Sequence, residues 1–342
     1  MTSGFFDFGA ISRDAIDSST IDQLADRFCD EKGRKNQETG KRYRRELDFF
    51  FDTLRRFGGN PEEPSRQQVD RYLAYLLMEH QADHPGPCVR ECRELPYAPT
   101  SVARRRDVIS AFYEYVSAVP SRPNYNPAKQ LHVELAEQTA VDILTEDENL
   151  TVWNATRAHR WRDGIAVGLA GGMGMRREEV VRARAENLGR NEKGPTLRFW
   201  RVKGRYWQTE IVPAPVYDVI MTSLDGRTHG PIVTAAKTKM IRNAETGLLE
   251  PEHLSVRGLT YVFEQIREYS GVRPDDLHCH LLRHTSITFA CTLRDLSKDR
   301  IKKFYGHVSD KDHRRYNAFA NQVFVREIIN PMQGLGFWAL AA

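Results

Sequence analysis

Apolar residues recur at helical spacing through the first third of the chain. From Thr39 onward an apolar residue returns about every 3.6 positions, which predicts an amphipathic helix. Ser65 and Gln68 form an S-x-x-Q capping box that opens a second helix after Pro64. A third helix is predicted from about Thr100, with a basic first half and an apolar second half. This part of the chain is therefore predicted to be a small helical bundle.

A proline-rich stretch separates this bundle from the rest of the chain. Residues 119–129 break regular structure and predict a linker. Beyond them, Thr145 and Glu148 form a T-x-x-E capping box that starts another helix. At roughly 150 residues per domain, 342 residues are enough for two domains. We expect a leader at 1–31, the bundle at 32–120, a linker at 121–143, a second domain at 144–316 and a tail at 317–342.

The second domain mixes helical and strand patterns. Helices are predicted at 163–171 and 176–187. Residues 196–202 and 206–212 are rich in β-branched and aromatic types and flank a short polar turn, which predicts a hairpin. After Tyr217 the pattern is again mostly helical. The expected fold class is mainly α with a small antiparallel sheet.

The composition is that of an ordinary globular protein. Hydrophobic residues make up 40% of the chain, charged residues 28% and aromatic residues 10%, which excludes bulk disorder. The longest weakly apolar stretch, 165–175, falls short of the about 20 residues of a membrane span, so no membrane partner is expected. The acidic N-terminus lacks the features of a secretory signal, and five cysteines do not make a disulfide framework. We expect a cytoplasmic protein.

The net charge is unevenly distributed. The total is only +4, but residues 1–31 hold seven acidic and two basic residues, a net −5, which leaves +9 for the remainder. A basic body permits a polyanionic partner. Candidate contacts to a DNA backbone, at the basic ends of the predicted helices and in the hairpin turn, are Lys41, Arg42, Arg44, Arg45, Arg104, Arg105, Arg106 and Arg205. The alternative for these residues is a solvated charged face. The acidic leader is expected to be a tether or a subunit contact.

Three separated segments concentrate the polar groups that phosphoryl transfer needs. The first places an arginine at a helix start with a glutamate one turn later, and the second places two histidines and an arginine on one helical face. The third places a histidine after a glycine, with a tyrosine nine residues on. The residues concerned are Arg176 and Glu179, then His280, Arg283 and His284, then His307 and Tyr316. Each segment alone is compatible with ordinary structural roles.

The order of these segments resembles the tyrosine recombinase (phage integrase) family. The family's T-G-L-R-x-x-E pattern is matched by Gly174 to Arg176 and Glu179, its H-x-L-R-H box by residues 280–284, and its L-G-H box with a later tyrosine by Gly306, His307 and Tyr316. Lys203 corresponds to the lysine that the family carries in a hairpin turn. Two departures are visible: Tyr305 replaces the usual Leu, and no Thr precedes Gly174, which affects the turn that holds Arg176.

The resemblance implies both a fold and an activity. The fold would be a helical core-binding bundle (SAM-like) followed by an α+β catalytic domain, the second domain above. The activity would be site-specific recombination of double-stranded DNA through a 3′-phosphotyrosine and a Holliday junction. The implied partners are further copies of the chain, as a homo-tetramer on DNA, and an accessory directionality protein. No metal and no other cofactor is expected, because the covalent link keeps the energy of the cleaved bond.

Phosphodiester transfer needs a nucleophile, cations at the non-bridging oxygens and a proton for the departing sugar oxygen. Tyrosine suits the first task, since its pKa of about 10 makes the phenolate accessible. Arginine suits the second, because its fork binds phosphate bidentately. The expected roles are Tyr316 as nucleophile, Arg176 and Arg283 as phosphate binders, Lys203 as proton donor, His280 as acceptor of the tyrosine proton or phosphate-orienting group, His307 as donor to a phosphate oxygen, and Glu179 and His284 as supporting residues.

Several alternatives stay open at this point. A type IB-like DNA topoisomerase has similar chemistry, and a DNA-binding protein without catalysis is a candidate of another class. Tyr305 is a rival nucleophile, although its apolar neighbours favour a core position. A metal site has the ligand types it needs in His80, His84, Cys88 and Cys92, but intervening prolines make this the weaker interpretation. Three residues that flank Tyr316 contact DNA, activate its phenol or are solvated, namely His313, Arg314 and Arg315. The apolar tail after Tyr316 packs on its own domain or on a neighbouring subunit.

Overall fold

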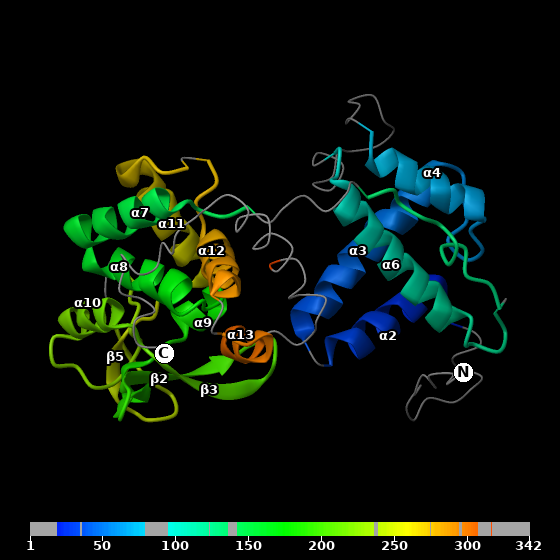
Figure 1. Ribbon diagram of the computed structural model, residues 1–342. Helices are drawn as coiled ribbons and strands as arrows, with labels where there is room; N and C mark the ends of the chain where they lie inside the picture. Colours follow the sequence, from blue (N-terminus) through cyan, green and yellow to red (C-terminus); the bar gives the residue numbers. More distant parts are fainter. Residues whose placement is uncertain are drawn as a thin grey trace. The chain divides into compact units, whose positions relative to one another are not determined.

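The computed structural model describes residues 19–34, 36–78, 95–122, 124–135, 142–235, 239–273, 275–293, 296–306 and 316. The chain divides into two compact units, Met1–Thr139 and Ala140–Ala342, which we call the N-terminal unit and the C-terminal unit (Figure 1). The division falls within residues 121–143, the predicted linker. The N-terminal unit is helical, and the C-terminal unit adds two small antiparallel sheets to its helices, which confirms the predicted fold class.

An aromatic core holds the N-terminal unit together. The described helices are α2 (Ile21–Gly33), α3 (Gln37–Arg56), α4 (Arg66–Leu76) and α6 (Pro99–Val116). Phe28 of α2 and Phe112 of α6 are fully buried, and their ring centroids lie 5.6 Å apart. Ser65 caps α4 through the predicted box with Gln68. The predicted helical bundle is therefore confirmed, with one helix more than the sequence pattern indicated.

That additional helix, α2, corrects the prediction of a leader at residues 1–31. Leu24, Ala25 and Phe28 lie fully buried against the bundle, so residues 21–33 are part of the folded unit. The acidic residues of this stretch lie on the outer face of the same helix. The net charge does not indicate the apolar face of α2, because the acidic and the apolar residues both recur at helical spacing and lie on opposite faces.

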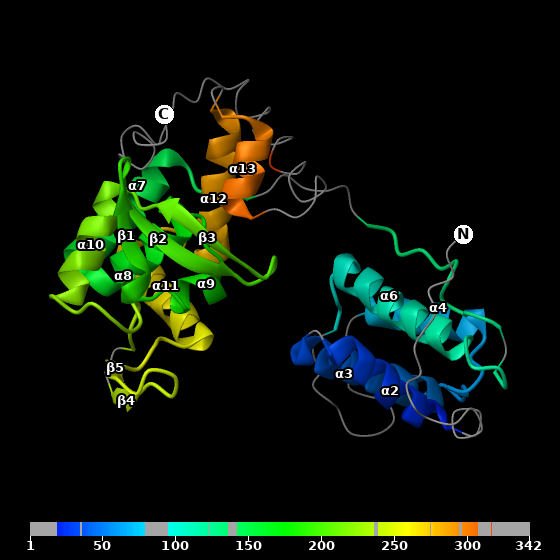
Figure 2. The same ribbon diagram turned by 90° about the horizontal axis from the view of Figure 1, so that it is seen from below.

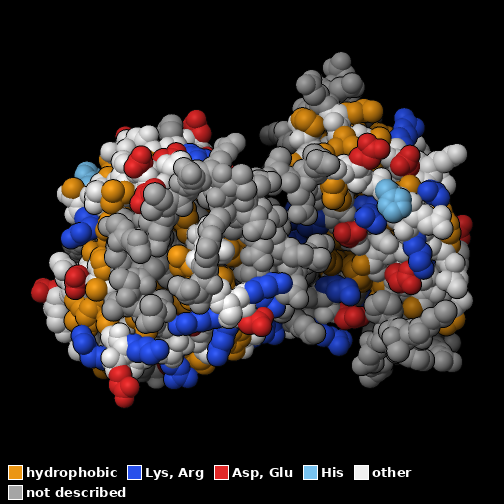
Figure 3. All heavy atoms as spheres, viewed as in Figure 1, with side chains coloured by type: hydrophobic (Ala, Val, Ile, Leu, Met, Phe, Trp, Pro, Cys, Tyr) orange, Lys and Arg blue, Asp and Glu red, His pale blue; other side chains and the backbone are white. Residues whose placement is uncertain are grey.

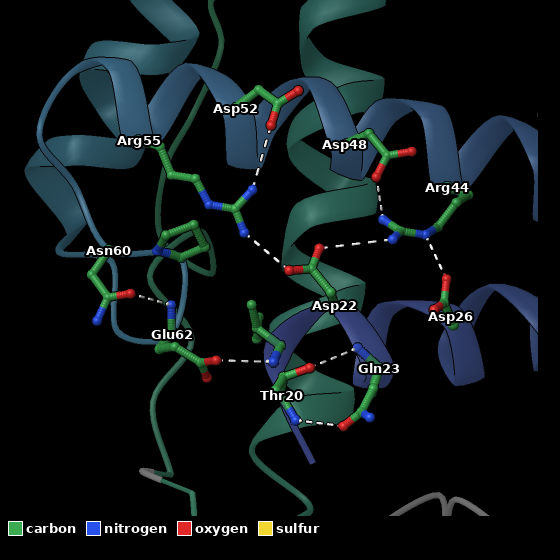
Figure 4. A network of polar contacts seen from close by, with 12 residues as sticks. Thr20, Asp22, Gln23, Asp26, Arg44, Asp48, Asp52, Arg55, Asn60 and Glu62 are labelled. Atoms are coloured by element: carbon green, nitrogen blue, oxygen red, sulfur yellow. Dashed lines mark hydrogen bonds and ion pairs between the residues drawn. The ribbon is translucent and has the colours of Figure 1, made fainter.

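The outer face of α2 is joined to α3 by ion pairs, which Figure 4 shows from close by. The Arg44 Nε donates to Asp26 Oδ1 at 2.7 Å, and the same guanidinium pairs with Asp48 and, at 3.7 Å, with Asp22. Arg55 donates to Asp22 Oδ2 at 3.0 Å. Partly exposed pairs of this kind contribute up to about 1 kcal/mol each. They fix how α2 lies on α3 more than they stabilise it.

The C-terminal unit consists of many short elements (Figure 2). Its helices are α7 (Glu146–His159), α8 (Trp161–Val167), the π-helical turn η1 (Gly168–Gly172), α9 (Arg177–Val181), the 3-10 turn η2 (Ala185–Asn187), α10 (Ala214–Leu224), α11 (Val256–Ser270), α12 (Cys279–Thr292) and α13 (Lys298–Tyr305). Its strands are β1 (Leu188–Asn191), β2 (Gly194–Arg201), β3 (Tyr206–Ile211), β4 (Met240–Arg242) and β5 (Leu249–Pro251). None of the described helices is long and apolar enough to cross a membrane.

Of two helices predicted in this unit, one is present and the other is shorter. The helix expected at 163–171 is present as α8 followed by η1, and a Cβ on Gly168 of η1 would lie only 2.8 Å from Val216. The helix expected at 176–187 ends at Val181, after which the chain turns through η2 into β1. The local helical pattern of this second segment is therefore interrupted where the chain turns into the sheet.

The predicted hairpin is present as β2 and β3, and β1 pairs with β2 to complete a three-stranded antiparallel sheet in the order β1-β2-β3. Trp200 of β2 pairs with Trp207 of β3, and Arg201 pairs with Tyr206 at the turn end of the hairpin. Strand β1 and the separate β4–β5 ribbon were not expected from the sequence. The hairpin turn carries Lys203, so this sheet determines where that side chain lies.

Candidate active site

Two of the predicted site residues, Arg176 and Arg283, meet at the C-terminal end of α13. The last carbonyl groups of a helix have no partner within the helix and carry the negative end of its dipole. Three arginines from other elements donate to them. Arg201 donates to the carbonyl of Phe304, Arg283 to that of Tyr305 (Nη2–O 2.6 Å) and Arg176 to that of Gly306 (Nη2–O 3.3 Å). Both predicted phosphate-binding arginines are thus fixed to one scaffold.

Arg176 is the N-cap residue of α9 and is held by Glu179, one turn later. The Arg176 backbone N–H donates to Glu179 Oε2 at 2.9 Å, and its Nη1 donates to Oε1 at 3.1 Å. The Glu179 side chain is fully buried, whereas the Arg176 side chain is 16% exposed. The arginine is therefore anchored at one side and reaches solvent at the other.

Arg283 of α12 lies deeper and keeps its charge. Its side chain is buried and also donates to the carbonyl oxygen of Gly174. Burial and the neighbouring Arg176 lower the pKa of Arg283 to about 9, which still leaves it protonated at pH 7. The guanidinium groups of Arg201, Arg176 and Arg283 all act on the single carboxylate of Glu179. This excess of positive charge suits a bound phosphate.

The turn before Arg176 depends on a glycine packed against a tyrosine. Gly174 has a φ of +58°, and a Cβ at this position would lie 2.2 Å from Cε1 of Tyr305. The Tyr305 side chain is buried, and its hydroxyl donates to the Ser286 carbonyl at 3.0 Å. Burial raises the pKa of Tyr305 well above its usual value. Tyr305 is therefore a core residue, and its hydroxyl is not placed to act as a nucleophile.

The histidines of α12 lie beside Tyr316. The ring centroids of His280 and His284 are 4.5 Å apart in an edge-to-face arrangement, so both occupy the predicted shared face of the helix. The His284 Nδ1 lies 2.8 Å from the hydroxyl oxygen of Tyr316, whose side chain is only 7% exposed. The sequence predicts that His280 accepts the tyrosine proton or orients the phosphate, and in this structure the direct contact with the Tyr316 hydroxyl is made by His284.

Lys203 and Arg205 are exposed in the turn between β2 and β3. Figure 3 shows lysine and arginine side chains gathered on the C-terminal unit over β2, β3 and α13. Exposed basic residues of the sheet and its turns include Lys193, Arg198, Lys203 and Arg205. The hairpin therefore presents positive charge close in sequence to the buried Arg201, whose contacts tie β2 to α9 and α13.

The basic residues predicted to contact DNA from the N-terminal unit differ in their surroundings. Arg44 is bound by the carboxylates of Asp22, Asp26 and Asp48, which offset its charge. Arg105 packs over the ring of Tyr97 at 4.4 Å. Exposed members of the set are Lys41, Arg45 and Arg104, with Arg42 and Arg106 partly buried. A contact to DNA stays a prediction for all of these residues, and the geometry favours the exposed ones.

Some predicted residues lie outside the described part of the chain. These are His307, His313 to Arg315, the candidate metal ligands His80, His84, Cys88 and Cys92, and the tail at 317–342. Within the described ranges, no group of three or more His, Cys, Asp or Glu side chains is arranged to hold a metal ion.

Sequence reasoning missed two residues of this site, Arg201 and Gln208. Arg201 is fully buried and donates to Gln208 Oε1 at 2.7 Å, while Gln208 Nε2 donates to the carbonyls of Lys303 and Phe304. The available signal was strand alternation, which places both side chains on the inward face of the hairpin. A charged residue at an inward position of a strand requires a partner.

Comparisons with known proteins bear on the family and the fold of the chain. No family model matches the chain. The chain is 25% identical over 239 residues to the tyrosine recombinase XerC of Staphylococcus carnosus, covering 68% of this chain and 75% of that protein.

Solved structures share the fold at lower identity. Lambda integrase (residues 75–356) bound to DNA superposes with a TM-score of 0.63 at 16% identity, covering 91% of this chain and 100% of that one. The Tn1549 transposon integrase in complex with transposon right end DNA gives a TM-score of 0.62 at 13% identity, covering 90% and 99%. The XerH recombinase bound to its difH substrate gives 0.59 at 14% identity, covering 91% and 85%. The chain has the fold of the tyrosine recombinases, and its relatives support the resemblance to that family.

Replacing Gly174 with alanine tests the turn that carries Arg176. We expect Gly174→Ala to lower the free energy of unfolding by about 3 kcal/mol, from a strained positive φ and the clash with Tyr305. Gly171→Ala is the matched control, because its nearest contact is 3.8 Å away, and should change stability by less than about 1 kcal/mol. Urea denaturation of the full chain measures both. Equal effects of the two substitutions would contradict the packing described.

His280 should be neutral in the absence of DNA. Burial and the nearby Arg283 lower the pKa of His280 to about 4 from its usual 6.5, although the ring keeps an exposed edge. Because the folded-state pKa is lowered, the unfolded chain binds more protons between pH 6.5 and 4, so stability falls as the pH is reduced through this window. An NMR titration of the His280 ring, assigned with His280→Asn, should give a midpoint near 4. A midpoint near 6.5 would refute the expectation.

Proposed function

We propose that this protein is a site-specific DNA recombinase that cleaves and rejoins DNA through a 3′-phosphotyrosine on Tyr316. The observation that carries the proposal is the convergence of Tyr316, His284 and Arg283 on one face of α12. The Tyr316 hydroxyl lies 2.8 Å from His284 Nδ1. The phenol of Tyr316 also lies close enough to Arg283 to raise the pKa of its guanidinium. A nucleophile, a proton acceptor and a phosphate-binding cation therefore occupy one site.

In this mechanism Arg176 and Arg283 bind the scissile phosphate. Both are anchored to carbonyl groups at the end of α13, which fixes their forks before DNA arrives. Fixed cations are worth more than flexible ones, because no reorganisation is needed as charge develops on the non-bridging oxygens. His280, neutral in the free protein, and His307 donate further hydrogen bonds to these oxygens.

Proton transfer follows from the same geometry. The Tyr316 hydroxyl donates its proton to His284 Nδ1, which requires the neutral ring to carry its hydrogen on Nε2. The phenolate forms a bond to phosphorus, the bond from phosphorus to the 5′ oxygen breaks, and Lys203 protonates that oxygen. In the reverse direction a 5′ hydroxyl of the partner strand attacks the phosphotyrosine, and Tyr316 is released. No high-energy cofactor is needed, since one phosphodiester replaces another.

We further propose that the protein acts as a homo-tetramer on two DNA duplexes. A structural neighbour supports this: lambda integrase has been solved as a tetramer bound to a Holliday junction, with a TM-score of 0.61 to this chain. The partners in this assembly are double-stranded DNA with a specific site, other copies of the chain, and an accessory protein that sets direction. We expect the complex in the cytoplasm.

A nicked duplex that loses its 5′-hydroxyl fragment after cleavage tests the nucleophile. The site is first located by footprinting the protein on the DNA that flanks its own gene. The unmodified protein should form a denaturant-resistant adduct with this duplex, and Tyr316→Phe should abolish the adduct because it removes the attacking oxygen. Tyr305→Phe is the control and should retain the adduct, since its hydroxyl is bonded to Ser286 in the core. An adduct with Tyr316→Phe, or none with the unmodified protein, would reject the proposal.

Substituting His284 tests the proton acceptor. We expect His284→Gln to slow single-turnover cleavage by about 100-fold, the typical contribution of a positioned general base, with little change in DNA affinity. His253→Gln, at an exposed histidine outside the site, should cleave at the unmodified rate. A cleavage rate unchanged by His284→Gln would show that His284 is not the proton acceptor.

A separate assay distinguishes a recombinase from a topoisomerase. A recombinase exchanges strands between two duplexes, whereas a topoisomerase relaxes one supercoiled circle.

A further inference from the structure

Arg201 is a fully buried arginine at the end of β2, and none of the roles assigned above requires it. Its side chain is 0% exposed and its guanidinium lies over the ring of Phe199, 4.5 Å from the centroid. Removing a guanidinium from water is costly unless every donor finds a partner. A buried arginine therefore costs more free energy of folding than an apolar residue of similar size. Arg201 is for this reason a candidate for a functional role.

The contacts of Arg201 reach three elements of the site. Its Nη1 donates to Glu179 Oε2 at 2.7 Å, its Nε donates to Gln208 Oε1 at 2.7 Å, and its Nη2 donates to the Phe304 carbonyl. The backbone of Gly306 also lies against it, since a Cβ there would be 3.2 Å from the Arg201 Cδ and Nε. One side chain therefore connects the hairpin, α9 and the end of α13.

The contact with Glu179 affects Arg176. The Glu179 carboxylate accepts hydrogen bonds from the Arg176 backbone and Nη1 as well as from Arg201, so it is shared between two guanidinium groups. Burial alone would raise the pKa of Glu179, but Arg201 and then Arg176 outweigh it, and the pKa is lowered. The buried carboxylate is thus ionised, and Arg201 and Arg176 are its two ion-pair partners.

We propose that Arg201 is a positioning residue for DNA cleavage, which neutralises Glu179 so that Arg176 can direct its outer donors to the scissile phosphate. Without Arg201, the ionised carboxylate has Arg176 as its nearest cation and draws that guanidinium onto both of its oxygens. The fork then turns from the phosphate towards the protein. The effect is transmitted through Glu179, since all three guanidinium nitrogens of Arg201 donate to groups within the protein.

The inference rests on the proposed recombinase function and is tested with the full chain on the nicked duplex described above. Three variants are compared with the unmodified protein: Arg201→Met, Glu179→Gln, and the double variant. Arg201→Met should slow single-turnover cleavage by about 100-fold, the cost of misplacing a reacting or binding group by about 1 Å, while DNA affinity measured by fluorescence anisotropy changes by less than about threefold. Thermal unfolding of each variant sets an assay temperature at which all are folded.

The double variant separates positioning from simple structural damage. Once Glu179→Gln has removed the carboxylate, there is no charge for Arg201 to neutralise, so the double variant should cleave within about threefold of Glu179→Gln alone and faster than Arg201→Met. This comparison holds even where Arg201→Met does not fold, because both remaining variants lack the buried carboxylate.

Two results would overturn the inference. One is cleavage by folded Arg201→Met at the unmodified rate. The other is a double variant about 100-fold slower than Glu179→Gln, because Arg201 would then act by a route other than Glu179. Both are measured relative to an unmodified protein that forms the adduct. An unmodified protein that forms none rejects the proposed function itself, so the two failures are distinct.

Discussion

The last carbonyl groups of α13 are the constraint around which the described part of the C-terminal unit is arranged. Three guanidinium groups from β2, α9 and α12 satisfy consecutive carbonyls of Phe304, Tyr305 and Gly306. Arg176 and Arg201 lie 130 and 103 residues from the carbonyls that they bind, and Arg283 lies 22 residues away on the preceding helix, so the helix end brings separate segments together. The same arrangement concentrates positive charge at one place, because a helix C-terminus favours cations.

That charge is stable only because it is partly neutralised inside the protein. Glu179 is the carboxylate shared by Arg176 and Arg201, and it holds the two groups at fixed positions. The remaining excess of positive charge is suited to an anion that is absent from the free protein. Folding thus leaves an excess of positive charge at the end of α13, in a fold that the chain shares with lambda integrase.

In the N-terminal unit, net charge and packing lead to different interpretations of α2. The net charge of residues 1–31 predicts an acidic tether where the first of the described helices, α2, lies. The packing shows instead that α2 is part of the folded unit. Phe28 is buried in the aromatic core, and Asp22 and Asp26 bind Arg44 on the neighbouring helix. A predicted DNA-contacting arginine is therefore paired within the protein, which no count along the chain could reveal.

Features that depend on local spacing are predictable from the amino-acid sequence. The capping boxes at Ser65 and Thr145, the hairpin around Lys203 and the common helical face of His280, Arg283 and His284 all follow from intervals of a few residues, and all are present. Tertiary structure alone decided which distant groups meet. The His284–Tyr316 hydrogen bond and the buried Arg201–Glu179 pair join residues 32 and 22 positions apart, where spacing carries no information. These contacts depend on burial, since only a side chain removed from water must find a partner inside the fold.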